Sequence, residues 1–188
     1  GFDYSNNHTH LHKYKGKWYL FYHSMSLRHN LGVKGGYRNV SVEEIPVDEQ
    51  TLKIEMIPAT YEGVQQIEIL NPFDLQQMET TAGTKDVKFE AYGDTGNMLA
   101  YTDATGSILV RGVGFGRKAR TLTINATGTG RLEVRENNPE GTLIAAMDIS
   151  SPEMSATKVR LTASPASVTD LCFLFKGEDL RIDSWRFR

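Results

Sequence analysis

An aromatic β-hairpin near the start of the chain limits what this sequence can fold into. A short polar turn, Lys15-Gly16-Lys17, separates two strand-like runs, and the second run reads Trp18-Tyr19-Leu20-Phe21-Tyr22. Such runs on either side of a glycine turn predict a hairpin. One small sheet with aromatic residues on both faces cannot bury them alone. We therefore expect it to pack against a second domain, another chain, or further sheets of the same domain.

The composition favours a protein made of strands and argues against a nucleic-acid partner. The 188 residues suffice for one ordinary domain, or for a small domain and part of another. The 17 glycines, with many Thr, Val and Ile residues, favour an all-β fold with many turns. The 21 basic and 23 acidic residues give a net charge of −2, whereas a nucleic-acid binder needs a basic stripe. No run approaches the roughly 18 apolar residues of a membrane span, so we expect no membrane partner.

The first residues leave the cellular location open. The sequence begins Gly1-Phe2-Asp3 rather than with Met, and it contains no recognisable signal peptide. We expect the natural start to lie elsewhere, so the protein is secreted or periplasmic if its full-length form carries a signal peptide. The single cysteine, Cys172, lies in an apolar run and is expected to be a buried, unreactive strand residue.

Two segments with different strand patterns predict two modules, residues 1–70 and 71–188. The first has four strand-like runs, at 8–14, 17–24, 37–47 and 51–57, which is the strand count of one β-propeller blade. Asn71-Pro72 then marks a turn, and the absence of a Gly/Ser tract predicts a short, stiff linker.

The second module alternates short strands with turn clusters, which predicts a β-sandwich. Trp185 is expected in its core, and Trp18 within the first module. The predicted strands are 75–80, 86–91, 98–102, 107–115, 119–126, 130–136, 142–148, 157–163, 170–176 and 179–187. The predicted turns are Gly128-Thr129-Gly130, residues 137–141, and Ser150-Ser151-Pro152.

Three alternating histidines, His8, His10 and His12, mark the first strand. On a strand they share one face, with successive residues about 6.5–7 Å apart. A His-rich set of this kind can hold zinc. The alternative is a polar strand face with solvated histidines.

The first 45 residues also carry a resemblance. The segments NNHTHLHKYKGKWYLFYH and GVKGGYRNVSVEEI resemble the last propeller blade of glycoside hydrolase family 43, of the arabinoxylan arabinofuranohydrolase and xylosidase type. From about Asn71 the chain resembles a family 6 carbohydrate-binding module. The resemblance implies an all-β protein with one four-stranded blade of an incomplete five-bladed propeller, followed by a β-sandwich of the jelly-roll type.

In family 43 a histidine of this blade projects into the central cavity, and an arginine after Gly-Tyr lines the substrate pocket. The resemblance assigns these roles to His8 and Arg38, although the second histidine of the family pattern is Thr9 here. The Asp base, Glu acid and second Asp of this inverting family lie in earlier blades, so we expect no hydrolysis by this chain alone. The nearby acidic residues match no family motif and are expected on a solvated edge; they are Glu43, Glu44, Asp48 and Glu49.

The sandwich resembles modules that hold a structural calcium ion. In these modules two polar residues of the opening strand and an aspartate of the last strand bind the ion. The resemblance assigns these roles to Gln77, Glu79 and Asp183. Gln77 and Glu79 are two residues apart and share a strand face, and calcium needs several oxygen ligands. The alternative is a hydrogen-bonded polar end of the sandwich.

The sandwich lacks most of the aromatic platforms on which such modules stack sugars. The two binding-loop regions, 103–108 and 151–156, contain no tryptophan, and Arg181 stands where the family has an asparagine. Tyr101 remains as a platform, with Tyr92 as a weaker second. The module is therefore expected to support the blade more than to grip a polysaccharide.

The resemblance implies part of a hemicellulose-degrading glycosidase, an α-L-arabinofuranosidase or β-xylosidase that inverts the anomeric centre. Two alternatives remain: a non-catalytic carbohydrate-binding module, and a structural subunit that completes the propeller of another chain. The implied partners are arabinoxylan or xylo-oligosaccharide of the plant cell wall, and the missing blades or a self-association partner.

Overall fold

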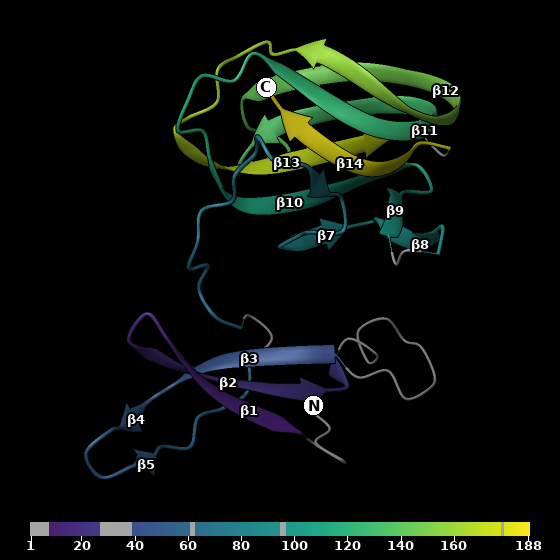
Figure 1. The fold of residues 1–188 in the computed structure, drawn as a ribbon. Coiled ribbons are helices and arrows are strands. Elements are labelled where there is room, and N and C mark those ends of the chain that lie inside the picture. The colour runs from purple at the N-terminus through teal and green to yellow at the C-terminus, as the bar shows by residue number, and fades with distance from the viewer. Residues whose placement is uncertain (1–7, 27–38, 61–62, 95–96, 178) are drawn as a thin grey trace. The chain divides into compact units, whose positions relative to one another are not determined.

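The computed structural model describes residues 8–26, 39–60, 63–94, 97–177 and 179–188. The elements that these residues form are strands (Figure 1). The chain divides into two compact units, Gly1–Gln65 and Gln66–Arg188. Among the described segments we find no helix with the length and apolar character needed to cross a membrane.

The first unit is built on an antiparallel sheet in the order β1 (Thr9–Tyr14), β2 (Lys17–Ser24) and β3 (Asn39–Ile45). The β1–β2 turn has left-handed backbone at Lys15 (φ 47°) and Gly16 (φ 81°), which suits a tight hairpin. Tyr19, Tyr22 and Ile45 are its buried apolar residues. The expected hairpin and the third strand of the expected blade are therefore present.

The fourth strand of the blade differs from the expected one in its pairing. Residues of β5 (Lys53–Ile54) pair with β4 (Val47–Asp48) and not with the three-stranded sheet. The carboxylate of Asp48 accepts hydrogen bonds from the backbone N–H groups of Gln50 and Thr51, at 2.9 and 3.2 Å, which tightens the turn. Pro46 has no N–H to extend the ladder of β3.

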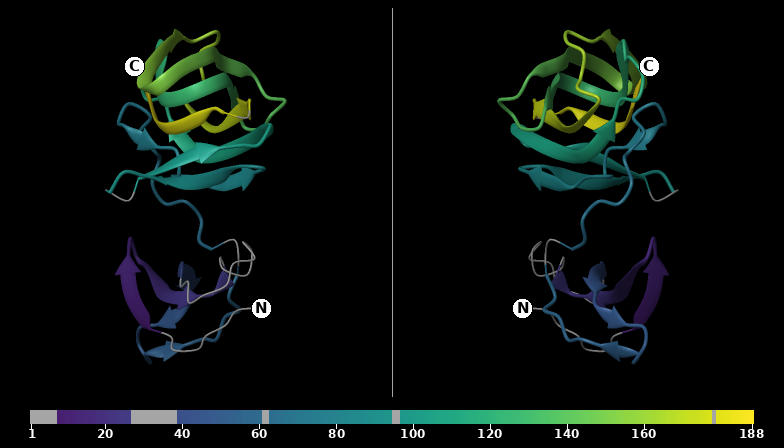
Figure 2. Two further views of the ribbon diagram at one scale, coloured as in Figure 1. Left: turned by 90° about the vertical axis from the view of Figure 1, so that its right-hand side faces the viewer. Right: turned by 90° about the vertical axis from the view of Figure 1, so that its left-hand side faces the viewer.

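The second unit contains one sheet that curls on itself into a β-sandwich (Figures 1 and 2). Within the described residues it has nine strands in the order β7-β10-β13-β11-β14-β9-β8, with β12 on β11 and β6 on β14. The bounds are β6 (Gln76–Gln77), β7 (Gly83–Lys85), β8 (Lys88–Tyr92), β9 (Asn97–Tyr101), β10 (Thr105–Gly114), β11 (Thr121–Glu136), β12 (Leu143–Arg160), β13 (Val168–Lys176) and β14 (Arg181–Phe187).

Two predicted turns are wrong because β11 and β12 continue through them. Gly128 pairs with Ser151 and Gly130 with Ile149, so the two glycine- and serine-rich stretches face each other across one long ladder. The register shifts between Ala126 and Gly128, which marks a β-bulge. The predicted turn at residues 137–141 is confirmed, since it joins β11 to β12.

A row of aromatic rings fills the core of the sandwich. Trp185 lies 5.2 Å from Phe173 and 5.9 Å from Phe187, measured between ring centroids, and Phe187 lies 5.0 Å from Phe115. Trp185 and Cys172 are both buried, as the sequence predicted, and burial raises the pKa of the Cys172 thiol. Trp18 is half-buried, and its indole N–H donates to Glu49 at 3.0 Å.

The segment just before the sandwich is bound to it by backbone hydrogen bonds. The N–H of Leu70 donates to the carbonyl of Gly112, and the N–H of Gly114 donates to Leu70, each at 2.9 Å. The side chain of Gln66 also donates to the carbonyl of Gly112 at 3.5 Å. These bonds place residues 66–70 with the sandwich, five residues before the boundary at 70/71 that the sequence suggested.

Gly128 is the position where we expect a single methyl group to destabilise the sandwich most clearly. Its φ is +86°, and an added Cβ would lie 1.8 Å from the carbonyl oxygen of Asp179. Left-handed backbone alone costs a non-glycine residue about 1–2 kcal/mol, and the backbone clash adds to that cost. We expect Gly128→Ala to lower the free energy of unfolding by about 2–4 kcal/mol in urea titrations. Gly116→Ala is the control, since its Cβ would meet no atom within 4 Å, and an equal loss there would contradict the explanation.

Candidate functional site

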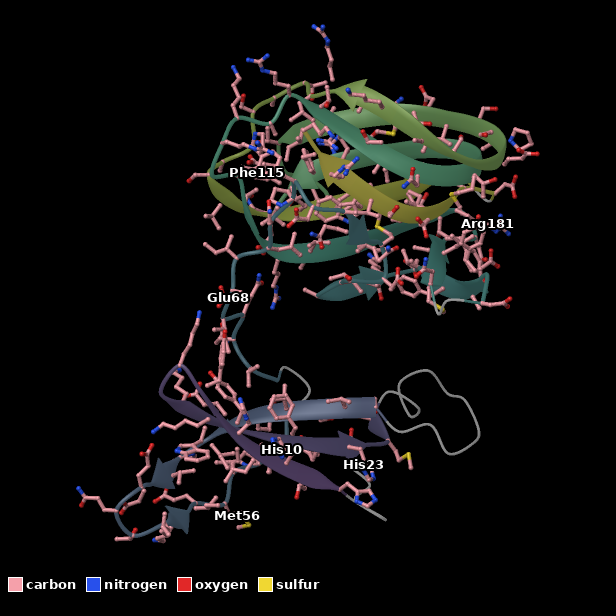
Figure 3. The ribbon with its side chains drawn as sticks, in the orientation of Figure 1. His10, His23, Met56, Glu68, Phe115 and Arg181 are labelled. Atoms are coloured by element: carbon pink, nitrogen blue, oxygen red, sulfur yellow. The ribbon has the colours of Figure 1, made fainter. Side chains whose placement is uncertain are left out.

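The histidine-bearing strand β1 presents exposed imidazoles that do not converge. The ring of His10, which is labelled in Figure 3, stacks with the ring of His12, and their centroids lie 5.8 Å apart. The backbone N–H of His8 donates to Nδ1 of His23 on β2 at 3.2 Å, and the two rings lie 5.9 Å apart. In the part of the chain that the structure describes, no three His, Cys, Asp or Glu side chains come together to hold a metal. The zinc alternative is therefore wrong for this strand, and Arg38 lies outside the described residues.

Glu43 is buried, so the expectation that it lies on a solvated edge is wrong. Its side chain is 6% exposed and accepts hydrogen bonds from the backbone N–H and the hydroxyl of Thr60, at 2.7 and 3.0 Å. The hydroxyl of Tyr22 lies 3.4 Å from the same carboxylate oxygen. The carboxylate therefore ties the segment after β5 to β3. It also borders a hollow of about 190 Å³, lined by Thr9, Leu20, Tyr22, Glu43, Ile57, Pro58 and Ala59.

The other three acidic residues are exposed, as predicted. Glu44 forms an ion pair with Lys17 at 2.8 Å. Glu49 bonds with Lys13, and this bond lowers the pKa of the Glu49 carboxyl. Asp48 caps its own turn. Surface pairs of this kind contribute little to stability and suggest no catalytic acid or base.

Three buried side-chain oxygens lie on residues of β6, of the turn after it and of β14. Gln77 pairs with Ser184, and the N–H of Met78 donates to the backbone carbonyl of Asp183 at 2.8 Å. Oε1 of Gln77, Oε2 of Glu79 and Oδ1 of Asp183 are buried, and no described residue donates a hydrogen bond to them. Burying carboxylate oxygens without a partner is costly. This set of hard oxygens therefore fits a bound cation such as calcium.

Tyr101 and Tyr92 lie on the same face of the β8–β9 hairpin. Tyr101 pairs with Lys88, and Tyr92 is four residues further along β8, so the alternation of the strand directs both to one side. Tyr92 is 40% exposed, while Tyr101 is half-buried. The guanidinium of Arg181 lies 5.4 Å from the centre of the Tyr101 ring.

Arg181 is itself held in place by two carboxylates. It donates to Glu90 at 2.7 Å and to Asp179 at 2.8 Å, and these bonds raise its pKa. A guanidinium beside the ring of Tyr101 makes a cation–π contact, so this side of the platform is occupied by protein. The β8–β9 hairpin therefore offers less free aromatic surface for a sugar than the sequence suggested, because Arg181 covers one side of the Tyr101 ring.

A charged cluster on β11 was missed in the sequence. Glu133 is only 7% exposed and bonds to Arg135, Lys176 and Arg131, at 3.0, 2.9 and 3.3 Å. These bonds lower the pKa of Glu133 to about 2, with Lys176 as the largest cause. The alternation Arg131-Leu132-Glu133-Val134-Arg135 was the signal, since it places three charges on one strand face. Because each of these three cations is paired with Glu133, we interpret the cluster as structural.

Comparison with known proteins relates both units to one kind of enzyme. The chain is 26% identical over 97% of its length to an arabinoxylan arabinofuranohydrolase of Paenibacillus polymyxa, and 28% identical over 93% to one of Bacillus subtilis. A crystal structure of a family 43 arabinoxylan arabinofuranohydrolase from Bacillus subtilis, in complex with cellotetraose, superposes over 97% of the chain with a TM-score of 0.80 and 25% identity.

The chain is a homologue of the family 43 arabinoxylan arabinofuranohydrolases. It spans 31% and 37% of the lengths of the two curated relatives and 40% of the crystallised enzyme. The sandwich also has the fold of the family 6 carbohydrate-binding modules. One from Clostridium stercorarium, solved with cellobiose, matches 64% of this arabinofuranohydrolase homologue with a TM-score of 0.58 and 19% identity, and is itself covered over 96%. No model of a protein family matches the chain.

Proposed function

We propose that this chain is the C-terminal portion of a hemicellulose-degrading glycoside hydrolase that releases arabinose or xylose from arabinoxylan with inversion. The supporting observation is the similarity to arabinoxylan arabinofuranohydrolases across both units together, 97% of the chain at a TM-score of 0.80. The chain itself would supply one propeller blade and an attached sandwich. The acid and base carboxylates would come from the other blades.

The exposed apolar residues of the first unit support a role that needs packing partners. Met56 is 99% exposed (Figure 3), Val40 79% and Leu52 78%. Large apolar side chains exposed in this way suggest a surface that other protein covers. We assign that surface to the missing blades, or to a second chain that completes the propeller.

In the complete site this chain would contribute binding groups and no acid or base. Arg38 would donate hydrogen bonds from its guanidinium to sugar hydroxyls, and His8 would line the central cavity. Both roles rest on the family resemblance. Positioning groups of this kind hold the glycosidic bond between the two carboxylates, which an inverting enzyme keeps roughly 6.5–9.5 Å apart.

A chimera tests the proposal. The matching segment of the Bacillus subtilis arabinoxylan arabinofuranohydrolase is replaced by this chain, and arabinose release from arabinoxylan is measured. We expect activity from the chimera and none from the isolated chain. Within the chimera, His8→Ala is expected to lower the rate at least about tenfold, because misplaced substrate reacts slowly.

His12→Ala is the matched control, since His12 is an exposed histidine of the same strand. A chimera that folds, as judged by its melting transition, but releases no sugar would contradict the proposal. Equal losses for His8→Ala and His12→Ala would contradict the role of His8.

We also propose a structural calcium ion bound by Gln77, Glu79 and Asp183. When bound, the ion would neutralise the buried oxygens and join β6 to β14. Millimolar calcium is expected to raise the Tm of the chain by about 10 °C, since a ligand at a hundred times its Kd adds about 2.7 kcal/mol. Asp183→Asn should abolish this rise. Asp148→Asn should keep it, because Asp148 is an exposed partner of Arg131. No calcium effect on the unaltered chain would contradict the site.

The sandwich fold favours a second candidate function, a carbohydrate-binding module that retains sugar without hydrolysing it. The crystallised modules of this fold were solved with cellobiose and with xylose. In this chain the exposed side of the Tyr101–Tyr92 face is the candidate surface. Affinity electrophoresis on soluble xylan tests it: retardation that Tyr101→Ala removes and Tyr14→Ala leaves unchanged would support binding there. Migration unaffected by xylan would exclude this candidate.

A further inference from the structure

A cluster of cations lies at one end of the sandwich, where β11 begins and β12 and β14 end. Its members are Lys118, Arg120, Lys158, Arg160 and Arg186. They come from three stretches far apart in the sequence, and the three strands β12, β11 and β14 lie side by side (Figure 1). We call these five residues the basic cluster.

Strand register places part of the basic cluster on one face. Thr123 of β11 pairs with Lys158 on one side and with Arg186 on the other, and Thr121 pairs with Arg160. The alternate residues, among them Leu122, are fully buried in the core. Since neighbouring strands lie about 4.8 Å apart, Lys158 and Arg186 flank Thr123 at about 10 Å from each other.

The face continues into a hollow of about 500 Å³. Three of the five cations line it, together with hydroxyl groups. The lining residues are Lys118, Ala119, Arg120, Thr121, Arg160, Leu161, Thr162, Ala163 and Ser164. A volume of this size lies within the range of small-ligand pockets.

The basic cluster has no counter-charge within the protein as described. Among the described residues none of its five cations forms an ion pair, whereas Arg131, Arg135 and Lys176 all pair with Glu133. Like charges gathered on one face repel one another and destabilise the sheet that carries them. A face that keeps such charges is suited to a ligand that supplies the missing negative charge.

We propose that the basic cluster and its hollow bind the uronic-acid carboxylates of an acidic polysaccharide. A sugar ring would occupy the hollow, where Thr121, Thr162 and Ser164 offer hydroxyl groups to its own hydroxyls. Arg120 and Arg160 would hold the carboxylate, a role to which the guanidinium fork is suited. The choice of a polysaccharide over other polyanions rests on the proposed function, and the hollow has no aromatic residue on which a nucleobase could stack.

The test uses the whole chain and two probes, polygalacturonate and the same polymer with its carboxyl groups reduced to alcohols. In isothermal titration calorimetry at low salt, we expect polygalacturonate to bind to this face and the carboxyl-reduced polymer not to bind. Lys158→Gln combined with Arg160→Gln should weaken binding about tenfold or more, because each screened pair contributes a fewfold. Raising NaCl to about 1 M should abolish binding, since the Debye length falls to about 3 Å.

Lys85→Gln combined with Arg111→Gln is the matched control, because both are exposed cations elsewhere on the sandwich and the change in net charge is the same. Its affinity should stay within about twofold of that of the unaltered chain. Equal loss in both double variants, equal binding of the reduced polymer, or no binding of polygalacturonate would overturn the proposal. Tighter binding of duplex DNA or of anionic lipid vesicles would assign the cluster to another polyanion and overturn the polysaccharide assignment.

Failure of the basic-cluster proposal can be distinguished from failure of the proposed glycosidase function. The chimera assay and the xylan retardation are run on uronate-free arabinoxylan and xylan, so neither involves the basic cluster. The double variant Lys158→Gln/Arg160→Gln should leave both unchanged.

Discussion

The backbone hydrogen bonds of β11 connect strands that would otherwise form two separate sheets. Its first half pairs with β14 and its second half with β13, while β12 follows it along almost its whole length. The change of partner requires a bend, which occurs at Gly128, where a left-handed backbone passes close to Asp179. Because the bend is built into one continuous strand, both layers of the sandwich share a single core.

The two halves of β11 carry different surface chemistry on their outward faces. Near its end, Glu133 forms ion pairs with three cations, Arg131, Arg135 and Lys176. Near its start, Thr121 and Thr123 lie between cations that have no counter-charge among the described residues. The strand that organises the core therefore also determines where a polyanion can bind.

The sequence predicted the elements whose signal is local. The glycine turn between two strand-like runs predicted the hairpin of β1 and β2, and runs between turn clusters predicted most sandwich strands. The apolar neighbours of Cys172 predicted its burial. Gly128 was misjudged because a glycine suits a turn and a bulge equally; only its pairing with Ser151 decides between them. Glu43 was misjudged for the same kind of reason, since its burial depends on Thr60, seventeen residues away.

The sites follow the same division between local and distant signals. The spacing of Gln77 and Glu79 suggested oxygens on one face. In the structure Gln77 pairs with Ser184, and the backbone N–H of Met78 donates to the carbonyl of Asp183 on the last strand. The basic cluster has no local motif, since Lys118, Arg160 and Arg186 are scattered along a chain whose net charge is −2. Only the register of three strands brings these charges together.

The bonds of Leu70 to Gly112 and Gly114 have a practical meaning for dissecting the protein. A cut placed at the predicted boundary, after residue 70, would remove the carbonyl and amide that complete the edge of β10. A cut before Gln66 keeps them, so the excised sandwich would retain its native edge. The boundary predicted from the sequence, after residue 70, thus lies five residues beyond the boundary at 65/66 that the structure shows.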